Sequence, residues 1–136
     1  MKTNYILFNK PSSCIYKPTI RMCNTEIARV GSCKFLGIYV DEKLNWKKQI
    51  DQTQTKLAKT LGLLYRARNL LDEVTLKTLY YSLFLPCLNY CSKIWGNTFK
   101  TNLQPIVTLQ KKAVRLICNA NRHEHTTPLF TRLNIL

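Results

Sequence analysis

Over the first forty residues, apolar and polar positions alternate with a period near two, which is typical of strands. Short runs between turn-forming residues predict strands at residues 4–8, 19–23, 26–30 and 33–40. Asn24 and Thr25 suit a tight connection between the second and third strands. We expect antiparallel pairing, and four short strands are too few to form an independently stable sheet.

After Asp41 the apolar period becomes about 3.6, which indicates helices. We expect Asn45 to cap a helix whose apolar stripe is Trp46, Ile50, Leu57, Leu61 and Leu64. Asp72 and Glu73 open a second helix, which is apolar almost all round and therefore expected to be buried. Because Pro86 cannot donate a backbone hydrogen bond, we expect a kink or break there, with helix resuming over residues 88–95.

A third helix is predicted over residues 103–117, capped by Asn102 or Thr101 and with Pro105 in its first turn. A last helix over residues 129–136 ends on apolar residues without a cap, so we expect the domain to be truncated there. The fold class is therefore α+β, with a small antiparallel part at residues 1–45 and a mainly helical bundle at 46–136.

The composition and net charge of the chain indicate a class of binding partner. The chain has 136 residues, enough for one domain, and its 46% hydrophobic content excludes a disordered polypeptide. It carries 21 Lys and Arg against 7 Asp and Glu, a net charge of +14. Such an excess repels itself unless a polyanion is near, so nucleic acid is the first partner to consider and anionic membrane the second. A merely cationic protein is the remaining alternative.

No apolar run approaches the length that crosses a bilayer, and the N-terminus lacks a signal-peptide core. We therefore expect no membrane partner and an intracellular location, nuclear or cytoplasmic, in which the six cysteines are buried free thiols. A zinc site formed by Cys87, Cys91 and Cys118 with His123 or His125 is the less favoured alternative, because the closest cysteine pair has helical rather than knuckle spacing.

Two basic helix faces are the candidate binding residues. The first helix carries Lys47, Lys48, Lys56, Lys59, Arg66 and Arg68, and the third carries Lys111, Lys112 and Arg115. Two such faces could line a duplex groove through phosphate contacts that do not read sequence. An ordinary solvated face is the alternative. We expect Trp46, Tyr90 and Trp95 to lie in the core and the two histidines to lie in an exposed loop.

Five segments in a fixed order carry a resemblance to a known family. They are KTNYILF at residues 2–8, KFLGIYVD with LNW at 34–46, LYYSL with the IWG that follows at 79–96, LQKKAVRLI at 109–117 and TPL at 127–129. Together they resemble the C-terminal part of the reverse transcriptases of jockey-type non-LTR retrotransposons. The resemblance implies a late palm strand, then a primer-grip hairpin at Phe35, Leu36, Gly37 and Ile38, then a thumb. An ordinary hairpin in which the glycine marks a bulge is the alternative.

The resemblance also implies what this chain lacks. The family uses paired aspartates that hold Mg²⁺, and this sequence has no Asp-Asp. We therefore expect no catalysis and no cofactor here, with the metal-binding residues upstream of Met1. The expected partners are the template–primer duplex or RNA and the missing upstream polymerase region. Two alternatives stay open: an independent basic helical module that binds protein, and a transposon relic without function.

Overall fold

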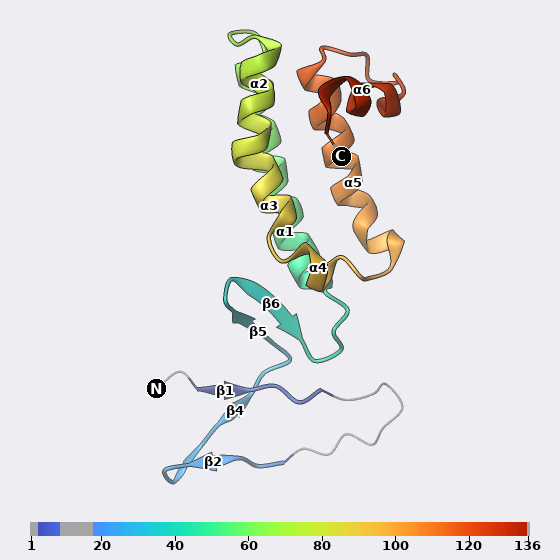
Figure 1. The fold of residues 1–136 in the computed structure, drawn as a ribbon. Helices are drawn as coiled ribbons and strands as arrows, with labels where there is room; N and C mark the ends of the chain where they lie inside the picture. Colours follow the sequence, from blue (N-terminus) through green and yellow to red (C-terminus); the bar gives the residue numbers. More distant parts are fainter. Residues whose placement is uncertain (1–2, 9–17, 136) are drawn as a thin grey trace. The chain divides into compact units, whose positions relative to one another are not determined.

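The computed structural model describes residues 3–8 and 18–135, which form two compact units, Met1–Gln49 and Ile50–Leu136 (Figure 1). The first unit contains six short strands in three pairs. They are β1 (Asn4–Tyr5), β2 (Arg21–Met22), β3 (Thr25–Glu26), β4 (Ala28–Arg29), β5 (Ser32–Phe35) and β6 (Ile38–Asp41). With the helices that follow, the fold class is α+β, as predicted from the sequence.

The pairing of the first strand differs from the expected antiparallel arrangement. Strand β1 pairs with β4 in parallel, with Asn4 opposite Ala28 and Tyr5 opposite Arg29. The N–H of Val30 extends the pair by donating to the Tyr5 carbonyl at 2.9 Å. Parallel pairing needs a crossover of a dozen or more residues, and the chain between the two strands is long enough to supply it.

The strand predicted at residues 26–30 is divided between two sheets. Glu26 pairs with Arg21 in the β2–β3 hairpin, whereas Ala28 pairs with β1. The hairpin turn has positive φ at Cys23 and Asn24, one residue earlier than expected. Two-residue hairpin turns of the primed types have such positive φ values. These turns are favoured because their backbone twist matches the twist of the flanking strands.

The helical unit contains the rest of α1 (Lys47–Ala67) and all later helices. These are α2 (Glu73–Leu79), the π-helical segment η1 (Tyr80–Phe84), α3 (Leu85–Asn89), α4 (Ser92–Trp95), α5 (Lys100–Ile117) and α6 (Thr126–Leu133). In Figure 1 the α2–α3 helix lies beside α5, and α6 lies against the C-terminal part of α5. Among its described residues, the buried apolar side chains come from every helix except α3 and from Ile135 after α6: Ile50, Leu57, Leu64, Leu76, Tyr80, Phe84, Trp95, Ile106, Ala113, Val114, Ile117, Leu129, Leu133 and Ile135.

The stripe predicted for α1 is largely confirmed, since Ile50, Leu57 and Leu64 are buried. Its start is different. Helix α1 begins at Lys47, and Trp46 precedes it in the left-handed region with φ 62°, so this tryptophan is half-buried outside the helical stripe. Asn45 does act near the start: its Oδ1 accepts the N–H of Lys47 at 3.0 Å.

The second predicted helix is amphipathic and not buried all round. Leu76, Tyr80 and Phe84 are buried, while Val74 and Leu83 are exposed. Of the kink or break expected at Pro86, the break is absent, because Pro86 lies within helix α3. The helix predicted over residues 88–95 is interrupted between the end of α3 at Asn89 and the start of α4 at Ser92. The π-helical segment η1 ends two residues before this proline, and its wider turn accommodates a ring that would otherwise clash with the carbonyl four residues earlier.

Other details of the later helices differ from expectation. Helix α5 starts at Lys100 after Phe99, without a side-chain cap, so Pro105 lies inside the helix and not in its first turn. Trp95 is buried as predicted, and its Nε1 donates to the Tyr90 carbonyl at 2.8 Å. The Tyr90 side chain is exposed, which contradicts the core position predicted for it.

Helix α6 has the C-terminal cap that its sequence did not reveal. Asn134 adopts a left-handed conformation with φ 52°, and its N–H donates to Thr131. The N–H of Ile135 donates to the Phe130 carbonyl at 3.0 Å, which completes a Schellman motif. The expectation of an uncapped helix end is therefore wrong. Asn119 and Ala120 close α5 in the same way.

We predict a large difference between two leucines of α1. Leu57 is 0% exposed and Leu63 is 56% exposed. Leu57→Ala should lower the free energy of unfolding by about 2–5 kcal/mol, because it removes buried contacts and leaves a cavity. Leu63→Ala should change it by less than about 0.5 kcal/mol. Urea denaturation followed by circular dichroism measures both, and equal effects would contradict the assignment of the buried stripe.

A pH dependence follows from the N-cap of α2. Asp72 accepts the N–H of Thr75 at 3.3 Å, and this hydrogen bonding holds the pKa of Asp72 below its ordinary value of 3.8. The contribution to stability is therefore present above pH 3.8 and is lost as the pH falls through the lowered pKa. Asp72→Ala should lower the melting temperature near about pH 7 and have little effect near about pH 2, while Asp72→Asn keeps an acceptor. A pH-independent loss would contradict this.

Candidate nucleic-acid interface

The basic residues of α1 separate into a continuous face and two outlying sets. Successive residues of an α-helix are turned by about 100°, which puts Lys59 and Arg66 opposite the buried side chains of Ile50, Leu57 and Leu64, and puts Lys56 on the flank, about 100° from Leu57. All three basic side chains are exposed. From Lys56 to Arg66 the helix rises about 15 Å, so their charges form one ridge along the helix. We call these three residues the α1 ridge.

The predicted residues Lys47 and Lys48 lie in the first unit, where Lys48 has partners of its own. Its Nζ donates to Ser32 Oγ at 2.9 Å and lies 4.9 Å from the centroid of the Tyr39 ring. Lys34 Nζ approaches the same ring at 5.9 Å. Lys47 is exposed at the start of α1. The structure therefore associates Lys48 with the β5–β6 hairpin and not with the α1 ridge.

Arg68 lies just beyond the end of α1. Its guanidinium carbon is 4.3 Å from the centroid of the Tyr65 ring, a distance at which a cation is attracted to the face of an aromatic ring. Charge pattern alone did not reveal this pairing, although the three-residue spacing of the two residues is the helical neighbour spacing.

The basic residues of α5 have two different environments. Lys111 and Lys112 are exposed on the side away from Ile106, Ala113 and Ile117. Arg115 is half-buried, and its Nε donates to the carbonyl of Glu124 at 3.0 Å. Arg115 therefore holds the loop before α6 against α5. The two lysines keep exposed ammonium groups.

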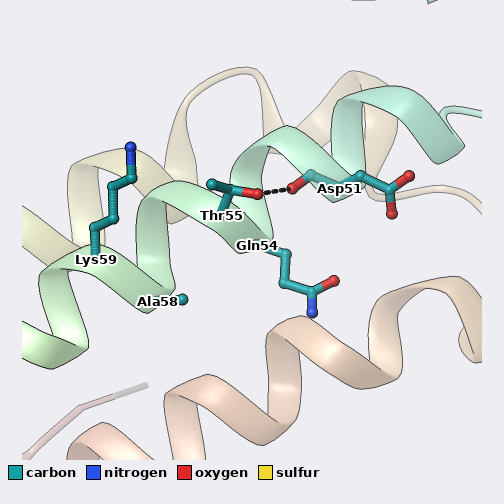
Figure 2. Close-up of a pocket in the computed structure, with 5 residues that line it drawn as sticks. All are labelled: Asp51, Gln54, Thr55, Ala58 and Lys59. Atoms are coloured by element: carbon teal, nitrogen blue, oxygen red, sulfur yellow. Dashed lines mark hydrogen bonds between the residues drawn. The ribbon is translucent and has the colours of Figure 1, made fainter.

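A polar groove lies between α1 and α5. Its volume is about 360 Å³, and it is lined by Gln54 of α1 together with Thr101, Gln104, Pro105, Thr108, Leu109 and Lys112 of α5. On the α1 side, Gln54 also lines a second pocket, with Asp51, Thr55, Ala58 and Lys59. Figure 2 shows the Gln54 amide pointing toward the neighbouring helix while Lys59 points away from it.

The groove combines neutral hydrogen-bonding groups with one lysine, Lys112 of α5, whereas Thr55 and Lys59 line the second pocket. Thr55 and Thr108 donate their hydroxyls to carbonyls four residues earlier, at 2.9 and 2.8 Å, so their oxygens remain able to accept. The sequence reasoning missed these groups because it followed charge alone. The i, i+3 and i+4 spacing of Thr101, Gln104 and Thr108 was the available signal.

The predicted primer-grip residues form a hairpin, as the resemblance implies, and the single strand expected at residues 33–40 is wrong. Strands β5 and β6 pair antiparallel with Phe35 opposite Ile38, and Leu36 and Gly37 make the two-residue turn. The φ angles of these two residues are 46° and 83°. Gly37 therefore supplies a left-handed turn position, and no bulge is present in this pair. Phe35 and Leu36 are 64% and 75% exposed at the tip, and Ile38 is buried.

Hydrogen bonds within the first unit fix this hairpin to the start of α1. The side chain of Gln49 accepts the N–H of Tyr39 at 2.9 Å, and Gln49 is buried. The Asp41 carboxylate accepts the N–H groups of Asn45 and Trp46 at 3.2 and 3.1 Å. These hydrogen bonds hold the base of the hairpin in place, and the side chains of Phe35 and Leu36 at its tip are exposed to solvent.

Five of the seven acidic side chains make structural contacts. Glu42 pairs with Arg29 at 3.1 Å, Glu73 pairs with Arg132, and Glu124 accepts the N–H of Asn121 at 3.2 Å. Asp41 and Asp72 cap helix starts, as described above. Within residues 3–8 and 18–135, no three His, Cys, Asp or Glu side chains are grouped so that they could hold a metal ion.

The cysteines and histidines give no further candidate chemistry. Cys23 is exposed, and Cys33, Cys87, Cys91 and Cys118 are half-buried free thiols, so the expectation of buried thiols is wrong; Cys14 lies outside the described residues. Burial raises the pKa of the Cys118 thiol. His123 and His125 are exposed in the loop before α6, as predicted. None of the described helices combines the length and apolar character needed to cross a bilayer.

Comparison with known proteins identifies relatives across nearly the whole chain. The chain is 29% identical over 136 residues to the RNA-directed DNA polymerase from mobile element jockey of Drosophila melanogaster, covering 97% of this chain and 14% of that relative. It is 28% identical over 138 residues to the retrovirus-related Pol polyprotein from type-1 retrotransposable element R1 of Bradysia coprophila, covering 99% and 14%. A probable RNA-directed DNA polymerase from transposon X-element of D. melanogaster is 23% identical over 121 residues, covering 87% and 13%.

These matches confirm the resemblance to the jockey-type reverse transcriptases. The chain spans about one seventh of the length of the curated relatives it matches. No protein-family model matches the chain. No solved structure matches it.

The hairpin turn yields a prediction about backbone strain. A leucine in the left-handed region is disfavoured by about 1–2 kcal/mol, whereas asparagine tolerates it. Leu36→Asn should therefore stabilise the hairpin by about 1 kcal/mol and slow amide hydrogen exchange of β5 and β6 about fivefold. Phe35→Asn is the control, because it removes an exposed apolar side chain from an ordinary strand position. Equal slowing in both variants would show that turn strain is not the cause.

Proposed function

We propose that this chain, a relative of the reverse transcriptases of jockey-type mobile elements, is a part of such an enzyme that holds the template–primer duplex. The contact is made to phosphates by basic helix faces and does not read the base sequence. RNA-templated DNA synthesis is the activity of the parent enzyme, and this chain contributes to binding of the nucleic acid.

The observation that carries the proposal is the arrangement of charge on α1. Lys59 and Arg66 of the α1 ridge lie opposite the buried stripe and Lys56 lies on its exposed flank, so packing of the helical unit itself turns these cations outward. No Asp or Glu occurs between Asp51 and Asp72 to neutralise them along the helix. A ridge about 15 Å long can contact several successive phosphates of one strand.

Helix α5 supplies the second contact. Lys112 lines the groove between α1 and α5, and Lys111 is exposed next to it. The amides and hydroxyls of the groove can hydrogen-bond to sugar and phosphate oxygens, which positions a duplex without sequence readout. We include Arg115 as a residue that positions the α5 face through the loop it holds, because its Nε already has a partner.

The β5–β6 hairpin is proposed as a primer-grip-like element. Phe35 and Leu36 present exposed apolar surface at the turn, and Gly37 lets a nucleic-acid backbone approach closely. Lys47, Lys48 and Arg68 complete the basic residues assigned to nucleic-acid contact.

Nucleotidyl transfer itself is assigned to residues outside this chain. Five of its seven carboxylates already cap helices or loops or pair with arginine, and no Asp-Asp sequence is present. We therefore propose that Mg²⁺ is bound by other parts of the polymerase. A purified preparation of this chain should show no nucleotide incorporation.

A second candidate function is favoured by the exposed apolar side chains of the helical unit. Leu70 is 85% exposed, and Val74 and Leu83 are exposed on α2 and η1. Such residues suit a protein contact, either with another region of a longer polymerase or with an independent partner. Binding through these residues would depend little on salt, which separates it from phosphate contact.

We predict a steep salt dependence of duplex binding that depends on the α1 ridge. Removing one phosphate-binding cation should reduce the steepness of log affinity against log salt by about 0.9. Lys56→Gln, Lys59→Gln and Arg66→Gln combined should therefore reduce it by about 2.7 and weaken binding to all sequences alike. Fluorescence anisotropy of a labelled duplex, titrated at several salt concentrations, measures the slope.

The matched control removes the same number of charges elsewhere. Lys43, Lys93 and Arg122 are exposed and lie outside both basic faces. Their triple replacement by glutamine should leave the slope nearly unchanged. An affinity of the unmodified chain that is indifferent to salt would overturn the proposal, as would equal slope changes in the two triple variants.

A further inference from the structure

An exposed aromatic platform stands next to the C-terminal end of the α1 ridge. The Tyr65 side chain is 57% exposed, and the guanidinium of Arg68 lies over its ring at 4.3 Å. Arg66, the last residue of the α1 ridge, is its sequence neighbour and is exposed as well. We call Tyr65 and Arg68 the stacking platform.

The positive charge of the stacking platform belongs to Arg68, which forms no ion pair with an acidic side chain among the described residues. The nearest carboxylates that follow in the chain are Asp72 and Glu73. Asp72 accepts the N–H of Thr75, and Glu73 pairs with Arg132. Among the described residues, the ion pairs are those of Arg29 with Glu42 and Arg132 with Glu73, and neither involves Arg66 or Arg68.

We propose that the stacking platform binds an unpaired base of a single-stranded nucleic acid. Every base has a π-face that can stack on an aromatic ring or on a planar guanidinium, so such a contact tolerates any sequence. The cation already lying over the ring adds attraction to the base and to the phosphate that follows it. Arg66 then contacts that phosphate.

A duplex cannot use this platform in the same way. Its base faces are covered by their neighbours in the stack, and only an unpaired or extruded base exposes one. The proposal extends the proposed function from duplex phosphates to single-stranded bases, and it rests on different atoms. The platform lies where the α1 ridge ends, which suits a strand that leaves the duplex at that point.

The test compares two probes on the full chain: a labelled oligodeoxythymidylate of about 12 nucleotides and a labelled DNA duplex of about 12 base pairs. Tyr65→Ala should weaken binding of the single strand by about 5-fold to 150-fold and leave duplex binding unchanged. Tyr65→Phe is the matched control, because it keeps the ring, and it should bind both probes like the original chain.

Arg68→Lys provides a second comparison. It keeps the charge and loses the planar guanidinium, so it should weaken single-strand binding by a larger factor than duplex binding, to which Arg68 contributes charge. Circular dichroism checks that each variant remains folded, which the exposure of both side chains predicts.

The outcomes separate the two proposals. Unchanged single-strand affinity in Tyr65→Ala overturns the stacking platform while salt-dependent duplex binding upholds the proposed function. Equal losses for both probes in Tyr65→Ala also overturn the platform, because a base contact would spare the duplex. Single-strand binding that requires Tyr65, in a chain that binds no duplex, upholds the platform and overturns the proposed duplex grip. Binding of neither probe overturns both.

Discussion

The helical unit depends on one constraint: α1 must bury Ile50, Leu57 and Leu64 on one side. Burial of these side chains fixes the rotation of the helix about its axis, because turning it would expose them to water. Lys59 and Arg66 then have to lie on the opposite side and Lys56 on an exposed flank, where their charges stay hydrated. The proposed binding ridge is thus a direct consequence of core packing.

The sequence predicted the helices well where their apolar pattern was long. The stripe of α1 and the end of α5 at Ile117 follow from periodicity, which averages over several turns, whereas the short α6 spans Thr126–Leu133 and not the predicted residues 129–136. It could not predict the π-helical segment before Pro86 or the left-handed caps at Asn119 and Asn134, because these depend on backbone hydrogen bonds between particular residues. The strands were harder, since pairs of two residues carry almost no pattern, and parallel pairing of β1 with β4 depends on a long crossover.

The residues of the candidate site were likewise predicted only in part from the sequence. Charge pattern identified the basic positions, yet the environment of each became visible only in three dimensions. Lys48 donates to Ser32, Arg115 holds a loop, and Arg68 stacks on Tyr65. The polar groove between α1 and α5 could not be predicted, because it joins residues about fifty positions apart in the sequence.

Lysine footprinting tests the central claim most directly. The full chain is acetylated with and without a saturating short duplex, and mass spectrometry then gives the labelling of each lysine. Phosphate contact by the two basic faces predicts protection of Lys56, Lys59, Lys111 and Lys112, with Lys43 and Lys93 labelled equally in both samples. Equal labelling of all six lysines with and without duplex, or protection of Lys43 and Lys93 alone, would contradict the account.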